Sequence, residues 1–258
     1  MTTPHLPDVD CPADWPGPEA PALAGRVILV AGASGGLGGE FALQAARAGA
    51  EVVLLGRRVT ALERVYDQIE AEGGRAALYP FNLAGANPEE FQQLAETLAS
   101  QCGGLHGLVV ASAHHPGLGS IANAEPSDWL LGLHVNLSAP FLLVRTCLPL
   151  LQQQDDASIV FTINGPDSCR SAYWGAYGVA QAGLSQFAAI LADELDNTPV
   201  RVHGFDPGPM RTSLRQRVWF TEDPVTVPTP ERAAQVLTGL AGAQGKRFDG
   251  QLLRLTGG

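Results

Sequence analysis

Short apolar runs of strand length alternate along most of this chain with longer segments whose apolar residues recur at helical spacing. Strands that alternate with helices pair in parallel through right-handed crossovers, and both faces of such a sheet are buried. The pattern therefore predicts an α/β fold, a single doubly wound domain over residues 25–258 with a seven-stranded parallel sheet flanked by helices. The seven predicted strands are Arg26–Ala31, Glu51–Leu55, Arg75–Phe81, Leu105–Ala111, Ala157–Ile163, Val200–Phe205 and Gln251–Leu255.

Two helix starts can be recognised from local sequence. Asn87-Pro88-Glu89-Glu90 offers an N-cap, a proline at the first helical position and a glutamate two residues further on. Thr229-Pro230-Glu231 repeats the N-cap and the proline. We expect helices to begin at these places, and we find no internal repeat or second domain.

Residues 1–24 differ from the rest because they carry prolines at positions 4, 7, 12, 16, 18 and 21. Proline removes an amide donor and disfavours helix. The composition predicts an irregular N-terminal arm that is either disordered or packed on the domain through Trp15.

The charge balance argues against nucleic acid as a partner. The chain has 16 basic and 26 acidic residues, a net charge of -10, and Lys246 is its only lysine. A protein this acidic lacks the broad positive field that binds phosphate backbones. One or two local arginines and backbone amides would still suffice for the phosphates of a cofactor.

Four scattered cysteines form no C-x-x-C pair, and their spacing is that of neither a metal site nor a disulfide scaffold. No apolar run reaches membrane-spanning length, and the N-terminus has no basic-then-apolar signal pattern. We expect a cytoplasmic protein without a metal site or a membrane partner. The cysteines are Cys11, Cys102, Cys147 and Cys169.

A glycine-rich turn joins the first predicted strand to the helical run that follows it. Such a turn lets backbone amides approach a pyrophosphate, whose charge the helix dipole also favours. A merely tight turn is the alternative, but the position after the first strand of a parallel sheet favours a Rossmann-type dinucleotide site. Its candidate residues are Gly32, Ser34, Gly36, Leu37 and Gly38.

The second predicted strand runs into Gly56-Arg57-Arg58. An acidic residue here would bind a ribose diol and repel a 2′-phosphate, whereas arginine pairs with that phosphate. Arg57, helped by Arg58 and the Ser34 hydroxyl, therefore favours NADP(H) over NAD(H). Two solvated arginines before a helix are the alternative.

Further polar positions complete a recognisable set. Tyr177 and Gln181 stand four residues apart in Trp174-Gly175-Ala176-Tyr177-Gly178-Val179-Ala180-Gln181, and Asp206-Pro207-Gly208-Pro209-Met210-Arg211-Thr212 follows the sixth strand. Together with the spacing Gly32-x-x-x-Gly36-x-Gly38, this set resembles the short-chain dehydrogenases/reductases. The resemblance extends over about residues 23–258.

The resemblance implies roles for individual residues. Tyr177 would be the catalytic acid or base, and Asn136 would support a water path to it. Asn82 and Leu83 would lie beside the adenine, and Pro207, Gly208 and Thr212 would contact the nicotinamide end. The chain departs from the family at two catalytic positions, where Asn164 replaces the usual serine and Gln181 replaces the usual lysine.

The missing lysine has a calculable consequence. Free tyrosine has a pKa near 10, so about one molecule in a thousand is phenolate at neutral pH. A unit charge about 4 Å away, at an effective dielectric of about 20, would lower that pKa by up to about 3 units. Gln181 supplies no charge, although it can still donate a hydrogen bond. Asn164 can likewise still donate to a substrate carbonyl.

Two other segments depart from the family or have no assigned chemistry. Val110-Ala111-Ser112-Ala113 stands where the family usually has Asn-Asn-Ala-Gly. His114 and His115 follow at once, and we interpret them as exposed loop histidines rather than proton carriers. The segment 214–227 takes the place of the family's mobile substrate lid.

Two functions follow. The first is an NADP(H)-dependent oxidoreductase of weak or altered activity on a small-molecule carbonyl or alcohol substrate. The second is an inactive relative that binds NADP(H) in a structural or regulatory role; a lyase or epimerase has no residue in its favour. By resemblance we also expect a homodimer or homotetramer formed by helices at about 127–152 and 174–197, although their small residues would equally suit packing on the chain's own sheet.

Overall fold

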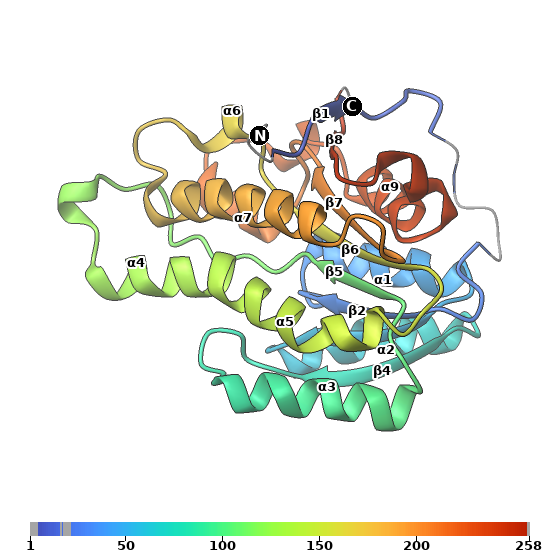
Figure 1. Cartoon of the computed structure of the whole chain (residues 1–258). Helices are drawn as coiled ribbons and strands as arrows, with labels where there is room; N and C mark the ends of the chain where they lie inside the picture. Colours follow the sequence, from blue (N-terminus) through green and yellow to red (C-terminus); the bar gives the residue numbers. More distant parts are fainter. Residues whose placement is uncertain (1–4, 16, 18–21, 257–258) are drawn as a thin grey trace.

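An eight-stranded parallel sheet forms the centre of the protein (Figure 1). The computed structural model describes residues 5–15, 17 and 22–256. The strand order is β1-β8-β7-β6-β5-β2-β3-β4, and every neighbouring pair is parallel. The strands are β1 (Asp8–Asp10), β2 (Val27–Ala31), β3 (Glu51–Gly56), β4 (Arg75–Pro80), β5 (Gly107–Val110), β6 (Ala157–Thr162), β7 (Val200–Asp206) and β8 (Leu252–Arg254).

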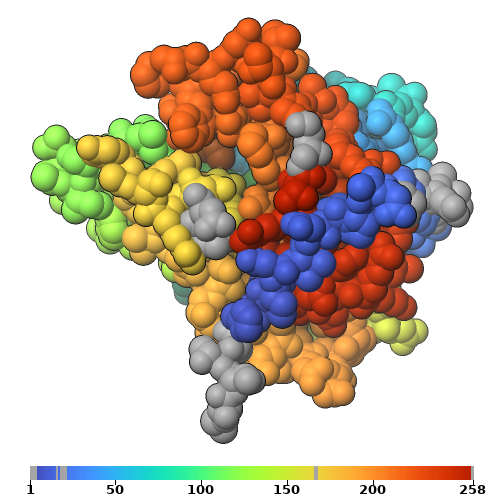
Figure 2. Space-filling model, turned by 90° about the horizontal axis from the view of Figure 1, so that it is seen from above, coloured from blue at the N-terminus to red at the C-terminus, as the bar shows by residue number. Residues whose placement is uncertain are grey.

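The prediction of seven strands was wrong, because three residues of the N-terminal arm form an eighth strand, β1. Its three residues pair with β8, Asp8 opposite Leu252 and Asp10 opposite Arg254. A strand this short and polar has no apolar signal of its own; the open edge of β8 supplies its hydrogen bonds. Figure 2 shows the N-terminal segment in blue lying along the C-terminal part in red.

The arm also packs on the domain, which is one of the two arrangements that the sequence left open. Trp15 is 3% exposed, and its ring centroid lies 5.3 Å from that of Phe248. The Arg232 guanidinium donates a hydrogen bond to the carbonyl of Trp15 over 3.0 Å. The arm therefore belongs to the folded unit through both β1 and Trp15.

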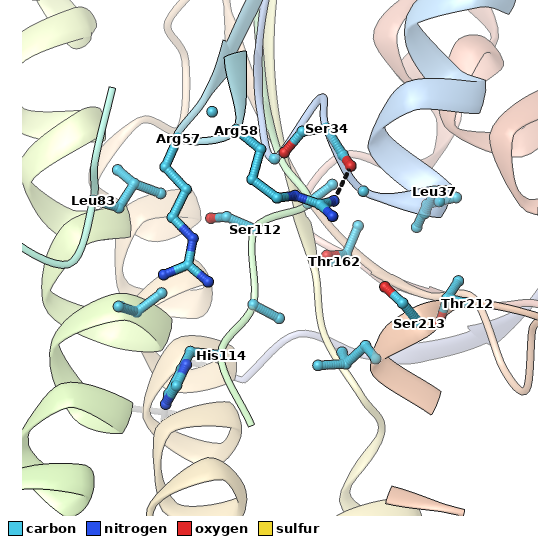
Figure 3. A pocket seen from close by; sticks show the side chains of 18 of the residues that line it. Ser34, Leu37, Arg57, Arg58, Leu83, Ser112, His114, Thr162, Thr212 and Ser213 are labelled. Atoms are coloured by element: carbon cyan, nitrogen blue, oxygen red, sulfur yellow. Dashed lines mark hydrogen bonds between the residues drawn. The ribbon is translucent and has the colours of Figure 1, made fainter. Parts of the chain in front are cut away.

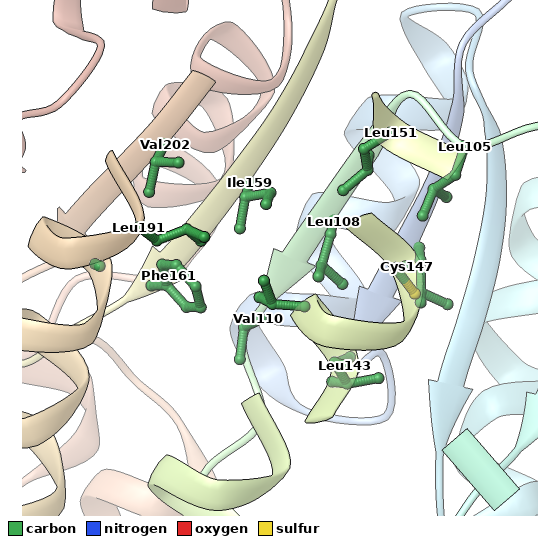
Figure 4. Close-up of a cluster of buried hydrophobic side chains, with 14 of the residues drawn as sticks. Leu105, Leu108, Val110, Leu143, Cys147, Leu151, Ile159, Phe161, Leu191 and Val202 are labelled. Atoms are coloured by element: carbon green, nitrogen blue, oxygen red, sulfur yellow. The ribbon is translucent and has the colours of Figure 1, made fainter. Parts of the chain in front are cut away.

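Helices cover both faces of the sheet. Strand β2 shows why, since Leu29 contacts the core on the side of α3, α5 and α7, and Ile28 contacts the core on the side of α1, α2 and α9. Figure 4 shows the first core, with Leu143 and Cys147 of α5 facing the strands. The α-helices are α1 (Gly36–Arg47), α2 (Val59–Ala71), α3 (Pro88–Cys102), α4 (Pro126–Leu133), α5 (Ala139–Leu151), α6 (Pro166–Cys169), α7 (Gly175–Glu194), α8 (Ser213–Val218) and α9 (Glu231–Ala241). Shorter helical turns are η1 (Ile121–Asn123), the π-helix η2 (His134–Ser138), η3 (Pro224–Thr226) and η4 (Ala243–Phe248).

One of the two predicted helix starts has the expected cap. At α3 the Asn87 side chain accepts from the Glu90 amide over 3.0 Å, and the Glu90 carboxylate accepts from the Asn87 amide over 2.9 Å. Helix α9 instead begins after Pro230 and has no side-chain cap, so the N-cap predicted at Thr229 was wrong.

The helical run Pro126–Leu151, made of α4, η2 and α5, has the length and mean hydropathy (1.3) of a membrane-crossing helix. Half of its most apolar window is buried inside the domain. A core helix that packs on a parallel sheet has the same composition, so the run is accounted for by its place in the fold.

The buried His203 on β7 makes stability sensitive to acid. Its Nδ1 lies 2.9 Å from the carbonyl of Phe248, so Nδ1 carries the proton. Within the described residues Nε2 is buried without a partner. Burial is the main reason that the pKa of His203 is lowered to about 4. The unfolded chain, with a histidine pKa near 6.5, therefore takes up the extra proton first as pH falls.

We expect this histidine to stabilise the protein fully above pH 6.5 and to lose its contribution between pH 6.5 and 4. From pH 6.5 to 5 the loss should be about 2 kcal/mol in the free energy of unfolding. Urea unfolding at several pH values measures it, with His203→Asn expected to flatten the slope and the exposed His5→Asn as the control. Equal slopes in all three proteins would contradict the assignment.

Candidate functional site

A cavity of about 310 Å³ lies at the carboxyl ends of the parallel strands. It spans the boundary between β2 and β5, where the strand order reverses. Doubly wound sheets bind their ligands at this switch point. The lining comes from the segments after β2, β3, β4, β5, β6 and β7, together with residues of η2, α4, α7 and α8.

The glycine-rich turn forms a cradle with little free space. Gly32 has a φ of 94°, and a Cβ there would lie 2.6 Å from the amide nitrogen of Ser112. A Cβ on Gly36 would lie 3.0 Å from the Thr212 methyl carbon. Gly38 is buried against the Gly32 carbonyl and does not line the cavity. Helix α1 has no side-chain cap, so its first amides remain available to an anion.

The predicted arginines lie at the same end of the cavity as the turn. Arg58 donates a hydrogen bond to the carbonyl of Ser34, whereas Arg57 extends toward His114 (Figure 3). The Ser34 hydroxyl lies close to Gly56, where a Cβ would be 3.0 Å from it. Two arginines therefore follow β3 and line the cavity, Arg58 beside Ser34 and Arg57 on the side of His114.

Asn82 and Leu83, which the resemblance would place beside the adenine, line the cavity. The Asn82 side-chain oxygen accepts a hydrogen bond from the Ala84 amide over 3.3 Å, which fixes the loop after β4.

The loop after β7 lines the opposite part of the cavity through Pro207 and Thr212. Thr212 also caps α8, since its hydroxyl oxygen accepts from the Arg215 amide over 3.2 Å. Gly208 has a φ of 65° and does not line the cavity. Its amide donates to the Asp206 carboxylate over 3.1 Å instead.

Asp206 joins the two loops that carry site residues. One carboxylate oxygen accepts from the Gly165 amide over 2.9 Å and the other from Gly208. Burial raises the pKa of this carboxyl, while the two amides lower it. Asp206 does not line the cavity. It holds the amides of Gly165 and Gly208, which are the chain neighbours of the lining residues Asn164 and Pro207.

Asp206→Asn should weaken NADPH binding, because asparagine has one oxygen and must turn its NH2 toward one of the two amides. A lost buried hydrogen bond of this kind costs about 1–3 kcal/mol. Thermal unfolding and NADPH titration measure the change. Asp249→Asn is the control, since only one carboxylate oxygen of Asp249 is used, by the Val202 amide. Equal effects of the two substitutions would refute this role of Asp206.

Asn164, Tyr177 and Gln181 meet at the inner end of the cavity and all three line it. The Gln181 side-chain oxygen accepts a hydrogen bond from the backbone amide of Asn164 over 2.8 Å. The Asn164 side chain in turn hydrogen-bonds the Tyr177 phenol. Gln181, which is 4% exposed, thus ties the end of β6 to α7.

The surroundings of Tyr177 oppose its ionisation. Burial is the largest cause of a raised pKa, followed by the nearby Cys169 and Asp206, and the hydrogen bond from Asn164 offsets only part of the rise. From the sequence we expected only that no cation lowers the pKa. The structure goes further, because the surroundings raise the pKa of Tyr177 above that of a free tyrosine and so keep the phenol protonated over a wider pH range.

Asn136 lies outside the cavity lining and supports it from behind. It belongs to the π-helix η2 and is 1% exposed. Its oxygen accepts from the His114 amide over 2.8 Å, and its NH2 donates to the carbonyls of His114 and Gly132, each over 2.8 Å. Asn136 therefore holds the loop after β5 in place.

His115 is not an exposed loop histidine, so that interpretation was wrong. It is 1% exposed, and its ring lies 4.7 Å from that of Tyr177 and 5.3 Å from that of Trp174. Nδ1 accepts from the Gly117 amide over 2.9 Å, and burial lowers the pKa to about 4. Neutral His115 packs on the ring of Tyr177 and does not itself line the cavity, and only the approach of α7 creates this contact.

Sequence reasoning missed several lining residues because their types are common in loops. Ser112 follows β5 and Thr162 is the last residue of β6, so their position at strand ends is the signal that points to them. The Ser112 hydroxyl and Nε2 of His114 are buried without a partner in the described part of the chain. Lining residues that were not among the predicted site residues include Ser112, His114, Thr162, Met210, Ser213, Leu214 and Arg217.

These features fit a dinucleotide. A Cβ at Gly32 or Gly36 would crowd the neighbouring atoms, so glycine keeps this turn narrow, and the uncapped first amides of α1 are available to a phosphate. The unsatisfied Ser112 hydroxyl is the kind of buried polar atom that a bound ligand satisfies.

The sheet order, the glycine cradle and the cavity at the switch point define a doubly wound α/β protein of the nucleotide-binding class. The chain belongs to the short-chain dehydrogenase family, whose model matches residues 26–223. It is 35% identical to the uncharacterized oxidoreductase YciK of Escherichia coli (strain K12), over 90% of this chain and 92% of YciK.

Solved structures are similar over nearly the whole chain. A protein described as a short chain dehydrogenase from Pseudomonas syringae is 36% identical, with a TM-score of 0.89 over 93% of this chain and 98% of that one. Another, from Escherichia coli CFT073 and complexed with NADPH, is 32% identical, with a TM-score of 0.89 over 93% of this chain and 100% of that one.

Proposed function

We propose that this chain binds NADP(H) in the cavity and reduces a small carbonyl compound with Tyr177 as the proton donor. One observation carries the proposal: the same cavity joins the glycine cradle at one end to the buried, protonated Tyr177 at the other. The family and its NADPH-complexed relative support the choice of cofactor.

The preference for NADP(H) over NAD(H) rests on Arg57, Arg58 and Ser34. We assign them to the 2′-phosphate, because guanidinium groups pair with phosphate and no acidic side chain lines this end of the cavity in the described residues. Gly32, Gly36 and Leu37 would hold the pyrophosphate, Asn82 and Leu83 the adenine, and Pro207 and Thr212 the nicotinamide end.

Bound NADPH would supply the hydride, and the chain would supply position and a proton. The Asn164 side chain orients the phenol of Tyr177, and the buried site keeps that phenol protonated. Reduction needs a proton donor, whereas alcohol oxidation needs phenolate as the base. The lost lysine should therefore impair oxidation more than reduction.

The alternative is a family member that binds NADP(H) without turnover. This alternative is supported by the hydrogen bond from the backbone amide of Asn164 to Gln181. Through this bond the residue at the family's lysine position has a structural role. Glutamine there strengthens the scaffold and leaves Tyr177 without an activating charge.

Two measurements separate these functions. Titration with NADPH and NADH should show tighter binding of NADPH, and consumption of NADPH should be detectable with at least one member of a panel of aldehydes, ketones and quinones. Binding without turnover on any substrate would favour the alternative. Failure to bind either nucleotide would remove both.

Assembly and cellular location are further proposals. Helices α5 and α7 leave Phe141 46%, Val179 52% and Ile190 42% exposed, which supports a homodimer or homotetramer through this face. All four cysteines are free, which agrees with a reducing cytoplasm. Light scattering at several concentrations would test the assembly.

A further inference from the structure

The cavity carries positive charge in a protein that is otherwise strongly acidic. The chain has a net charge of -10, yet Arg57, Arg58 and Arg217 line the cavity and no described aspartate or glutamate does. Under the proposed function, the two arginines after β3 are occupied by the cofactor. Arg217, which lies far along the chain in α8, then has no assigned role.

The arginines around α8 differ in their use. Arg211 donates to the carbonyls of Val225 and Val227, each over 3.4 Å. Arg215 makes a double hydrogen bond with Glu222, both contacts at 2.6 Å. These two hold the lid segment together.

Arg217 has no such contact. No hydrogen bond or ion pair engages it in the part of the chain that the structure describes, and its side chain lines the cavity. A guanidinium that faces a cavity and serves no structural contact is available to an anionic ligand.

The lid holds Arg217 near the catalytic end. The Trp219 ring at the end of α8 lies 6.3 Å from that of Trp174, and the Trp174 ring lies 5.9 Å from that of Tyr177. Thr212 caps the start of the same helix. Both ends of α8 are therefore fixed to elements that form the site.

The charge of Arg217 also acts at this end. Burial is the main cause of the lowered pKa values of His114 and His115, and the charge of Arg217 lowers both further. At His114, Arg57 also lowers the pKa and Asp128 on α4 raises it. The ring of His115 packs on that of Tyr177. Leu131, Val135 and Leu214 give the adjoining wall an apolar character. A ligand there would meet an apolar surface and one free cation.

We propose that Arg217 binds the carboxylate of the substrate, so that the substrates are oxo acids: aldehydes or ketones that carry a carboxylate separated from the carbonyl by an apolar spacer. The apolar wall would hold the spacer and Tyr177 would face the carbonyl. This inference rests on the proposed function and names the substrate class of the same site.

A matched pair of probes tests it, 4-formylbenzoate and its uncharged methyl ester. The wild-type protein should reduce the acid with the lower KM. Arg217→Gln should raise the KM for the acid by about 10- to 100-fold, the range of a lost hydrogen bond to a charged group. The KM for the ester and the Kd for NADPH should stay unchanged, and Arg217→Lys should restore part of the affinity for the acid.

Arg64→Gln is the control, because it removes the same charge from an exposed position of α2 outside the cavity. The inference is overturned if Arg217→Gln weakens NADPH binding by a similar factor, which would assign Arg217 to a cofactor phosphate. It is also overturned if the acid and the ester have equal KM values in the wild-type protein and equal responses to Arg217→Gln.

If the protein does not turn over, a binding measurement still tests the anion site. Calorimetry with NADP⁺ present should detect 4-(hydroxymethyl)benzoate but not its methyl ester, and Arg217→Gln should remove that binding. This result would support the anion site even if catalysis failed. Absence of binding together with absence of turnover would overturn the inference.

Discussion

Tyr177→Phe should lower NADPH-dependent carbonyl reduction by about 10²- to 10⁴-fold, the usual contribution of general acid catalysis. The substitution removes the hydroxyl that Asn164 orients and leaves the packing of the ring on His115 intact. Because the phenol is protonated at neutral pH, a plot of the rate of the wild-type protein against pH should show no titration of Tyr177 between pH 6 and 8. Stopped-flow measurement of NADPH consumption at saturating substrate reports the rate.

The control is Tyr173→Phe, which removes an exposed phenol four residues earlier and should leave the rate unchanged. NADPH affinity should be the same in both variants, since the Gly32 cradle and Arg57 are untouched. A rate that Tyr177→Phe does not alter would show that Tyr177 is not the proton donor.

The double substitution Gln181→Lys with Asn164→Ser should increase alcohol oxidation at neutral pH by up to about 10³-fold. An ammonium about 4 Å from the phenol would lower the pKa of Tyr177 by up to about 3 units at an effective dielectric of about 20. The gain should be smaller than this limit, because burial and Asp206 still disfavour the phenolate.

Gln181→Lys alone should cost stability. It removes the acceptor of the Asn164 amide, and an unsatisfied buried amide costs about 1–3 kcal/mol. Gln186→Lys, which adds the same charge at an exposed position of α7, is the control for both rate and stability. The measurements are NADP⁺ reduction with a panel of alcohols and urea unfolding.

The outcome also decides between the two functions. If the wild-type protein is inactive and the double variant gains activity, the fold was kept without the chemistry. If the wild-type protein turns over and the double variant is slower, the non-catalytic function is excluded. No gain in oxidation with a folded double variant would refute the role that we assign to the missing cation.

The central sheet could be predicted because its information is local. The seven predicted strands are mostly apolar runs, and their parallel order follows from the helices between them. Of these seven, only β4, at the edge of the sheet, has no buried residue. Gly32 and Gly36 were recognisable for a similar reason, since they belong to one glycine-rich turn between a strand and a helix. Arg57 was predicted from its position directly after the second strand.

The eighth strand and His115 could not be predicted in this way. The strand β1 exists because β8 offers an unpaired edge, and its own residues Asp8–Asp10 have no strand pattern. His115 is buried because Trp174 and Tyr177 of a distant segment cover it. In both cases the contacting segment lies far away in the sequence. A short stretch of sequence around Asp8–Asp10 or His115 therefore does not contain the residues that determine its structure.

The sequence by itself determined the fold class and the glycine-rich turn, and it placed Asn164 and Gln181 where the family resemblance leads us to expect serine and lysine, because each of these depends on residue type and spacing along one segment. Only the tertiary structure decided what these two residues do. It paired Gln181 with the Asn164 amide, placed Asp206 behind Tyr177 and turned the free Arg217 toward the cavity. Burial and electrostatic interactions depend on which segments meet in space, and they set both the protonation of Tyr177 and the charge of the cavity.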